Sequence, residues 1–301
     1  MRTLIGRRGR VPSLLPHQLR TPRRSAPPKK QNPNTLREVG VKPKPDTQTE
    51  MRALVISDVH ASLPALQAVL AAAPEHDTVW NLGDVVGYGA NPNEVVELAR
   101  KLGGIVVRGN HDRACCGNWK VGDHFNTAAR YAISWTRKTL SEENVRWLLR
   151  LPRGPVMLPG RRVICVHGSP RDEDEYVLSR SAASGAFRAT RARIILCGHS
   201  HGQFGIVSNR RGLAILKPTF QSSNDAAHFE LRLHERSRYL LNPGSVGQPR
   251  DRDWRAAFAV YDDAQSLFTW HRVPYKLRTA QMRIRRAGLP ETLATRLRAG
   301  K

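Results

Sequence analysis

The sequence of 301 residues predicts an α/β fold, and two features of its hydrophobic pattern indicate this class. Between residues 51 and 201, short apolar runs rich in β-branched residues alternate with segments of helical periodicity. After residue 201, strand patterns follow one another closely up to Val273. Strands that alternate with helices favour a sheet with crossover helices, and the later strands favour a second, largely antiparallel sheet.

Five apolar runs in the first part have the length of buried strands. They lack charged residues and are enriched in Val and Ile, as expected of strands that are covered on both faces. The five runs are Ala53–Ile56, Thr78–Leu82, Ile105–Val107, Val163–Val166 and Ile194–Cys197.

Helical patterns fill the intervals between these runs. Behind Ser62, which we expect to cap the helix N-terminus, apolar residues repeat at helical spacing in Leu63, Leu66, Val69 and Leu70. Two further helical segments are predicted over Asn93–Leu102 and Phe125–Leu149.

The chain beyond His201 contains strand patterns and then two helical ones. A hairpin is predicted around the turn Asn209–Gly212, between the strands Phe204–Ser208 and Leu213–Leu216. Four more strands are predicted over Phe229–Leu233, Tyr239–Leu241, Ala257–Tyr261 and Leu267–Val273. Two short helices, divided at Gly288 and Pro290, are expected within Arg278–Arg298.

The first fifty residues differ in composition from the rest. They contain eight of the 20 prolines, and twelve Lys and Arg against three Asp and Glu, which is +9 of the net charge of +24. Such a segment buries too little apolar surface to offset the entropy of ordering it. We therefore predict a disordered tail over residues 1–50 and one large domain over residues 51–301. The tail is either a basic arm that contacts an anionic surface or a misassigned start upstream of Met51.

Several features favour a cytoplasmic protein without a membrane partner. Arg7 and Arg8 form a twin-arginine pair, but no apolar segment of a secretion signal follows them. No stretch reaches the roughly 18 apolar residues that a membrane span requires. The 4 cysteines show neither disulfide nor zinc-ribbon spacing, which fits reduced thiols.

Residues able to bind a metal follow each of the five apolar runs. Because ligand sites of α/β sheets lie beyond the carboxyl ends of the strands, we expect these side chains to converge. Adjacent glycines allow the backbone to turn sharply there. The side chains are Asp58 and His60, then Asp84, then Asn110, His111 and Asp112, then His167, and finally His199 and His201.

The donor types in this set indicate transition metals. Three Asp or Asn oxygens and four imidazoles suit Mn²⁺, Fe, Zn²⁺, Ni²⁺ or Co²⁺ better than Ca²⁺. Seven ligands are too many for one tetrahedral ion, and they fit two ions about 3.5–4 Å apart that share a carboxylate. Asp84 is the candidate for the shared carboxylate, and a hydroxide held between the ions would be the nucleophile. We expect two divalent ions, with Mn²⁺ as the first choice and Mg²⁺ as a further alternative.

His111 and Asp112 are the candidate catalytic residues beside the metals. The leaving oxygen of a phosphate ester needs a proton, which a metal ion does not supply. We expect His111 to act as general acid or to stabilise transition-state charge, with Asp112 orienting its imidazole and raising its basicity.

These motifs resemble those of the calcineurin-like metallophosphoesterases, and the resemblance extends over about residues 51–301. It rests on Asp58-x-His60, Gly83-Asp84, Gly109–Asp112, His167-Gly168 and Gly198–His201. Other segments resemble the small bacterial and archaeal branch that contains general phosphodiesterases and an asymmetric diadenosine tetraphosphate hydrolase, namely Ala65–Leu70, Gly87–Gly89, Phe125-Asn126, Trp135-Thr136, His167–Pro170 and Asn242–Arg250. Ala61-Ser62 departs from that branch, in which Gly-Asn is usual.

The resemblance implies an αββα sandwich of two mixed β-sheets flanked by helices. It implies two metal sites that share Asp84, one formed with Asp58, His60 and His201 and the other with Asn110, His167 and His199. His111 takes the family's catalytic position beside the substrate phosphate. The implied activity is hydrolysis of phosphodiesters or phosphoanhydrides in small molecules, with dinucleoside polyphosphates, nucleotide monoesters and phosphoproteins as alternatives.

Two arginines are candidates for binding substrate phosphate. Arg171 follows the His167–Pro170 motif, and Arg250 closes the glycine-rich segment Asn242–Arg250. The backbone N–H groups of that segment would contact phosphate as well. The alternative is that the segment is a tight turn that returns the chain to the sheet. The variable stretch Ser208–Arg238 is a candidate for shaping substrate choice.

Two other classes of protein are alternatives to a hydrolase. A non-catalytic scaffold of the same fold normally lacks metal ligands or the catalytic histidine, and this sequence retains all of them. A nucleic-acid-binding protein is suggested by the net charge of +24, but no recognisable binding module accompanies that charge. We therefore expect a small phosphate-containing substrate and no nucleic-acid partner. The sequence leaves the oligomeric state open.

Overall fold

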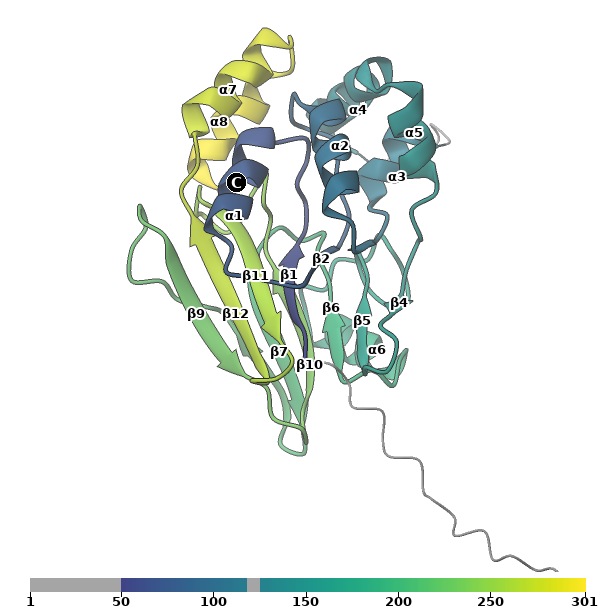
Figure 1. Ribbon diagram of the computed structural model, residues 1–301, viewed down its shortest axis with the longest axis vertical. Coiled ribbons are helices and arrows are strands. Elements are labelled where there is room, and N and C mark those ends of the chain that lie inside the picture. The colour runs from purple at the N-terminus through teal and green to yellow at the C-terminus, as the bar shows by residue number, and fades with distance from the viewer. Residues whose placement is uncertain (1–49, 118–124) are drawn as a thin grey trace, which may run out of the picture. The chain divides into compact units, whose positions relative to one another are not determined.

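The computed structural model describes residues 50–117 and 125–301, and these residues form four layers. Two six-stranded sheets pack face to face, and helices cover their outer faces (Figure 1). The strand order is β3-β2-β1-β11-β12-β9 in sheet A and β4-β5-β6-β10-β7-β8 in sheet B. This arrangement confirms the predicted αββα sandwich of two mixed β-sheets.

Sheet A combines strands from both ends of the domain. Its parallel strands are β1 (Arg52–Ile56), β2 (Thr78–Asn81) and β3 (Ile105–Val106). Its antiparallel strands are β11 (Ala256–Asp262), β12 (Leu267–Val273) and β9 (Ala227–Arg232). Because β1, β2 and β3 are parallel neighbours, their carboxyl ends lie side by side at one end of the sheet.

Sheet B is also mixed. The strands β5 (Val163–Cys165), β6 (Ile194–Leu196) and β10 (Arg238–Pro243) are parallel neighbours. The edges are antiparallel and consist of β4 (Val156–Met157) on one side and the hairpin β7 (Gln203–Asn209) and β8 (Gly212–Leu216) on the other.

Eight helices in the described residues form the outer layers. Seven of them pack on sheet A or on one another, and α6 covers sheet B. In Figure 1, α7 and α8 lie next to α1, and α2 to α5 form a second group. The helices are α1 (Leu63–Ala72), α2 (Pro92–Leu102), α3 (Asn110–Cys116), α4 (Thr127–Thr139), α5 (Glu142–Leu149), α6 (Arg180–Arg188), α7 (Leu277–Arg286) and α8 (Glu291–Ala299).

The core follows the alternation of side chains along the strands. On β1, Ala53 and Val55 face sheet B, whereas Leu54 and Ile56 face the helices. The layer between the sheets is filled by large aromatic side chains such as Trp80. Because side chains alternate between the two faces of a strand, a run that is apolar at every position fits a strand covered on both sides. This explains why five short apolar runs identified the central strands.

Three local expectations are corrected by the structure. The strands beyond His201 do not form a separate sheet, because β9, β11 and β12 complete sheet A while β7, β8 and β10 complete sheet B. The helical region Phe125–Leu149 consists of two helices, because Ser141 caps a new helix by accepting a hydrogen bond from Asn144 N. Ser62 occupies the N-cap position of α1, but its hydroxyl makes no cap hydrogen bond.

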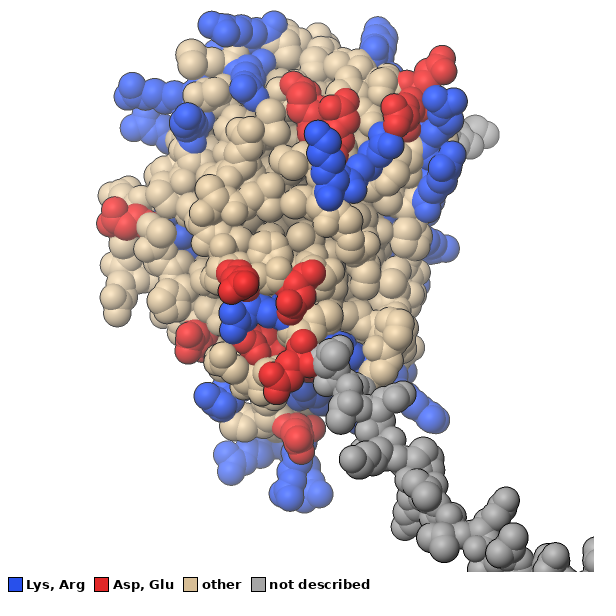
Figure 2. Space-filling view, viewed as in Figure 1, with Lys and Arg blue, Asp and Glu red and all other residues tan. Residues whose placement is uncertain are grey.

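Part of the positive charge of the surface lies on the C-terminal helices. Figure 2 shows lysines and arginines gathered over α7 and α8, and α7 alone contains four arginines. Except for Glu50, the tail predicted over residues 1–50 lies outside the described residues. All 4 cysteines are described and are free. No described helix is long and apolar enough to cross a membrane.

Candidate metal centre

The predicted ligands lie on loops that leave five strands, divided between the two sheets. Asp58 and His60 follow β1, Asp84 follows β2, and Asn110 begins α3 just after β3 in sheet A. The other side chains follow β5 and β6 in sheet B, and they are His167, His199 and His201. The carboxyl ends of both parallel strand groups therefore supply the site, which is the expected position for a ligand site in an α/β sheet.

The backbone at these loops adopts unusual conformations. Asp58, His60, Asp84, His199 and His201 all have positive φ values between 49° and 64°. A non-glycine residue in this left-handed region is strained by about 1–3 kcal/mol, and such residues gather at functional sites. The conformations are held by hydrogen bonds between the loops, for example from Asp58 N to Gly83 O at 2.9 Å.

Glycine is required where two of these loops touch. A Cβ atom on Gly109 would lie 2.1 Å from Oδ1 of Asp84, which is far closer than any van der Waals contact. The glycine before Asn110 therefore allows the loop after β3 to approach the loop after β2. This contact confirms the expected role of the glycines that accompany the predicted ligands.

One group of side chains gathers around Asp58 and His60. Oδ1 of Asp58 lies 3.2 Å from Nε2 of His201 and 3.8 Å from Nε2 of His60. Nε2 of His60 also lies 3.6 Å from Oδ2 of Asp84. Potential ligand atoms of Asp58, His60, Asp84 and His201 all lie within 4.8 Å of one another, and all four residues are buried.

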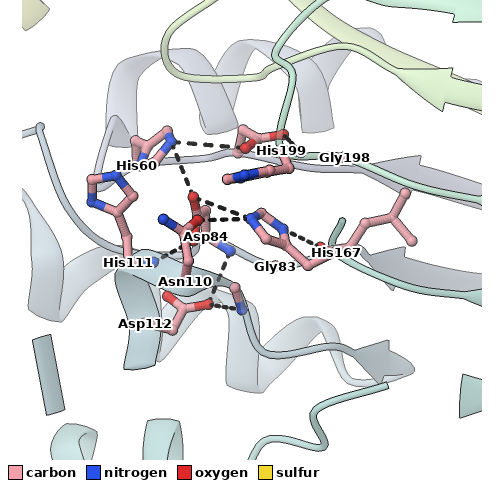
Figure 3. Close-up of polar contacts among 12 residues, drawn as sticks. His60, Gly83, Asp84, Asn110, His111, Asp112, His167, Gly198 and His199 are labelled. Atoms are coloured by element: carbon pink, nitrogen blue, oxygen red, sulfur yellow. Dashed lines mark hydrogen bonds and ion pairs between the residues drawn. The ribbon is translucent and has the colours of Figure 1, made fainter. Parts of the chain in front are cut away.

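A second group shares Asp84 with the first (Figure 3). Oδ2 of Asp84 lies 3.4 Å from Nε2 of His167, which in turn lies 3.1 Å from Oδ1 of Asn110. Potential ligand atoms of Asp84, His167 and His199 also lie within 4.8 Å of one another. The structure thus brings all seven predicted ligands together in two groups that have Asp84 in common.

The imidazoles are oriented by backbone carbonyl groups. Nδ1 of His60 donates to Val86 O at 3.1 Å, Nδ1 of His167 to Leu82 O at 2.8 Å, and Nδ1 of His201 to Gln248 O at 2.7 Å. His199 uses Nε2 instead, which donates to Asp174 O at 3.1 Å. A carbonyl oxygen accepts only, so each contact places a proton on that ring nitrogen and leaves the other nitrogen free to bind a metal.

This donor set fits divalent metal ions. Nε2 of His60 and Nε2 of His201 lie 3.2 Å apart, and both carry lone pairs when Nδ1 holds the proton. Two lone pairs at this distance need a cation between them. Oδ1 of Asp58 and Oδ2 of Asp84 are buried without a hydrogen-bond partner, a costly arrangement for carboxylate oxygens unless a cation binds them.

The pKa values agree with this arrangement. Burial lowers the pKa of His199 to about 3, and it lowers those of His60 and His201 well below the usual range, so these imidazoles are neutral. Burial opposes charge on His167 as well, but the Asp84 carboxylate beside it raises the pKa of His167 to about 10. Without metal, the Asp84 carboxylate and the protonated His167 imidazole therefore form an ion pair. His167 must lose its proton when a metal ion binds.

Asp112 has a different role from the expected one. Its carboxylate accepts hydrogen bonds from the backbone N–H groups of Asp84 at 2.9 Å, Val86 at 3.1 Å and Gly109 at 2.9 Å. Figure 3 shows the carboxylate pointing away from the His111 imidazole. Asp112 therefore does not orient that ring. Both of its carboxylate oxygens accept backbone hydrogen bonds that stabilise the loop carrying Asp84.

The imidazole of His111 is held by packing instead. Its ring contacts those of His60, Tyr88 and Phe125, with centroids 4.8, 4.4 and 4.7 Å away. Nδ1 is buried without a hydrogen-bond partner and faces Gly87, where an added Cβ would lie 2.5 Å away. Burial lowers the pKa of His111 to about 4, so the ring is neutral at neutral pH.

A pocket of about 150 Å³ opens beside the cluster and contains one of the two predicted arginines. Arg250 lines it and donates to Tyr88 Oη at 3.3 Å and to Gln248 Oε1 at 3.0 Å. No ion pair of the described residues includes Arg250, so its charge is available to an anion. Arg171 does not line the pocket, because it pairs with Glu175.

Two further pocket residues were missed by sequence reasoning. Arg296 reaches the pocket from α8, and Tyr176 stacks on His199 with ring centroids 3.8 Å apart. Arg296 lies far from the motifs in the chain. Tyr176 follows Pro170 by only six residues, but no local pattern marks it as part of the site. The composition of α8 (arginines on a helix at the end of the domain) was the one available signal for Arg296.

The glycine-rich segment Asn242–Arg250 supports the loops from behind. Val246 N donates to Ser57 O and Gly247 N to Asp58 O, both at 3.0 Å. Ser245 Oγ donates to Asp58 O at 2.8 Å. These backbone and side-chain donors already have acceptors within the protein, which supports the alternative that the segment is a tight turn. Of this segment, the Arg250 side chain lines the pocket.

The fold and the site define a metal-dependent phosphoesterase. Residues 51–265 match the model of the calcineurin-like phosphoesterase superfamily domain, and the chain belongs to this superfamily. It is 36% identical over 252 residues to an uncharacterized protein of Methanocaldococcus jannaschii, a match that covers 82% of this chain and 97% of the relative. These findings confirm the resemblance seen in the motifs.

A solved structure and a further sequence relative agree with this assignment. A metallophosphoesterase from Sphaerobacter thermophilus is 41% identical, with a TM-score of 0.73, and the match covers 84% of this chain and 100% of that one. A shorter match of 67 residues, 42% identical, links the chain to the symmetrical bis(5'-nucleosyl)-tetraphosphatase of Pectobacterium carotovorum. That match covers 21% of this chain and 24% of the relative.

Proposed function

We propose that the protein hydrolyses phosphodiesters or phosphoanhydrides of small molecules with two divalent transition-metal ions, which Asp84 holds in common. The observation that carries this proposal is the convergence of seven ligand groups with two buried carboxylate oxygens that lack hydrogen-bond partners. Asp58, His60, Asp84 and His201 would hold one ion. Asp84, Asn110, His167 and His199 would hold the other. When bound, such ions neutralise phosphate charge and activate a water molecule.

The side chains around the pocket have distinct tasks in this proposal. The unpaired guanidinium of Arg250 binds a phosphate oxygen and, with Arg296, orients the phosphoryl group. The neutral imidazole of His111 donates a hydrogen bond to the phosphate or to the leaving oxygen, which stabilises charge that develops there. Asp112 acts indirectly, because it fixes the backbone of Asp84.

Turnover of bis(p-nitrophenyl) phosphate tests this proposal. Mn²⁺-loaded protein should release p-nitrophenolate, and Asp84→Asn should abolish the activity because it removes the shared charge. Asp77→Asn is a suitable control, since Asp77 lies on the loop before β2, accepts a hydrogen bond from Arg52 N and is not among the predicted ligands. Absence of turnover with both ions bound would favour the non-catalytic scaffold.

Dinucleoside polyphosphates are a second candidate substrate. Two guanidiniums at one pocket suit a chain of several phosphates, and a tetraphosphatase is among the relatives with a local match. Product analysis with diadenosine tetraphosphate decides this question. ATP plus AMP would indicate asymmetric cleavage, and two ADP would indicate symmetric cleavage. If the protein hydrolyses diesters well but forms no product from diadenosine tetraphosphate, this substrate is rejected and the assignment as a phosphoesterase stands.

A further inference from the structure

A groove of about 730 Å³ lies next to the pocket of the metal centre. Arg250 lines both the groove and the pocket, so the two adjoin at this side chain. Ser200, which lies between His199 and His201 in the chain, also lines the groove. A ligand whose phosphate lies at Arg250 can therefore extend into the groove.

Part of the groove wall is apolar and exposed. Leu178 is 70% exposed and Ile215 is 48% exposed, and the rings of Phe204 and Phe220 lie nearby along the same groove. Seven large apolar side chains among the described residues are 46% exposed or more. Two of them line this groove, and a third, Tyr176, lines the adjoining pocket. Exposed apolar groups that gather beside a few polar ones are typical of a ligand site.

The charges in the groove favour an anionic ligand. Its two acidic residues are neutralised within the protein, since Asp251 pairs with Arg272 and Asp253 pairs with Arg255. By contrast, Lys217 is in none of the ion pairs formed by residues 50–117 and 125–301. The groove therefore presents a net positive charge beside its apolar wall.

Phe220 provides a fixed aromatic surface. The guanidinium carbons of Arg255 and Arg272 lie 5.6 and 5.8 Å from its ring centroid, and both arginines are buried and ion-paired. These cation–π contacts favour the observed position of the ring, which reduces the side-chain entropy lost when a ligand packs against it. Aromatic rings bury large areas and favour edge-to-face or offset contacts with another ring.

We propose that this groove binds an aromatic ring carried by the phosphate substrate, with Leu178, Ile215 and Phe220 as its contact residues. The proposal rests on the proposed function, because it places the substrate phosphate at the metal centre. The volume lies within the range of about 300–1,000 Å³ that is usual for ligand pockets. Aryl esters and nucleotides both carry a suitable ring.

Binding to the Mn²⁺-loaded protein tests the proposal without depending on turnover. Methylphosphonate and phenylphosphonate share the same charged group and differ in the ring. Isothermal titration calorimetry should show phenylphosphonate binding about tenfold or more tightly, as expected when an aromatic ring is buried. Thymidine 5'-monophosphate distinguishes the two sources of a ring. Tighter binding than phenylphosphonate assigns the groove to nucleotides, and weaker binding assigns it to aryl esters.

A double variant tests whether the preference for phenylphosphonate arises from contacts in the groove. Leu178→Gln with Ile215→Thr removes apolar contacts from two exposed positions and leaves the net charge unchanged. The preference for phenylphosphonate over methylphosphonate should fall to about twofold or less in this variant. Met157→Gln is the matched control, since Met157 is 56% exposed and lies on β4, at the opposite edge of sheet B from Ile215 on β8. It should retain the full preference.

The outcomes separate this proposal from the proposed function. Equal binding of the two phosphonates, or a preference that survives the double variant, would overturn the groove proposal and leave the hydrolase intact. A phenyl preference that depends on Leu178 and Ile215, in a protein that hydrolyses no phosphate compound, would support the groove and overturn the proposed function.

Discussion

Replacing Asp112 should destabilise the loop of Asp84 more than it alters the chemistry of His111. The Asp112 side chain is buried and accepts three backbone hydrogen bonds, and bonds to charged groups contribute about 1.5–3 kcal/mol each. Burial, followed by the charge of Asp84, raises the pKa of Asp112 to about 7, which favours the lower end of this range. In Asp112→Asn, one oxygen remains to accept two of the bonds, and the amide group then faces the third N–H. We expect a loss of about 2 kcal/mol for this variant and about 4 kcal/mol for Asp112→Ala.

Denaturant unfolding, with metal added and with metal removed, measures these losses. Titration with Mn²⁺ should also show weaker metal binding, because Asp84 loses the backbone contact that fixes it. His111→Gln is the matched control, since it changes the neighbouring side chain and keeps all three hydrogen bonds to Asp112. Normal stability and metal affinity in Asp112→Asn, together with the same kinetic defect as His111→Gln, would show that Asp112 does act through the imidazole.

Two further predictions follow from particular contacts, and a third follows from the composition of residues 1–50. Gly87→Ala should lower turnover while both metals stay bound, because a Cβ would lie 2.5 Å from Nδ1 of His111; full activity would contradict the placement of that ring. Burial opposes charge on His167, but the Asp84 carboxylate raises the pKa of His167 to about 10, and burial raises the pKa of Asp58 to about 7. Both residues therefore lose protons as metal binds, so metal affinity should rise at least about tenfold between about pH 6.5 and about pH 7.5. Equal affinities in metal titrations at these two pH values would contradict this coupling. We also propose that residues 1–50 are dispensable, so a chain that begins at Met51 should keep its melting temperature and turnover, and a marked drop in either would refute this.

The sequence predicted the central strands well because they are covered on both sides. Val163–Cys165 and Ile194–Leu196 have apolar side chains at every position, and this pattern is visible without any tertiary information. The assignment of later strands to sheets was wrong for a physical reason. Strands β9 and β10 follow one another in the chain but belong to different sheets, and nothing in their local pattern specifies which partner they pair with.

Short elements at the edges of the fold were also missed. Strand β4 has only two residues, and one of them, Met157, is exposed. Helix α3 begins at Asn110, directly on the ligand motif, and is not among the helices that the sequence predicts. Its formation depends on the carboxylate of Asp112, which accepts from Gly109 N at the start of the helix.

The sequence predicted which side chains gather at the candidate site better than it predicted the contacts that support them. The predicted ligands follow strand ends, and their donor types restrict the chemistry, so sequence alone could indicate that these seven side chains gather at one place. The partner of a carboxylate such as Asp112 depends on which way the side chain points, which requires the structure. The same is true of Arg171 and Arg250, since one is paired with Glu175 and the other is unpaired in the pocket.

The metal stoichiometry of three proteins tests whether two ions share Asp84. We predict two ions per chain in the Mn²⁺-loaded parent by elemental analysis after removal of free metal. Asn110→Ala should retain only the ion held by Asp58, His60, Asp84 and His201, whereas Asp84→Asn should weaken both sites because it removes the carboxylate they share. A parent protein with a single ion, or an Asp84→Asn variant that binds two ions as tightly as the parent, would contradict the shared two-metal centre.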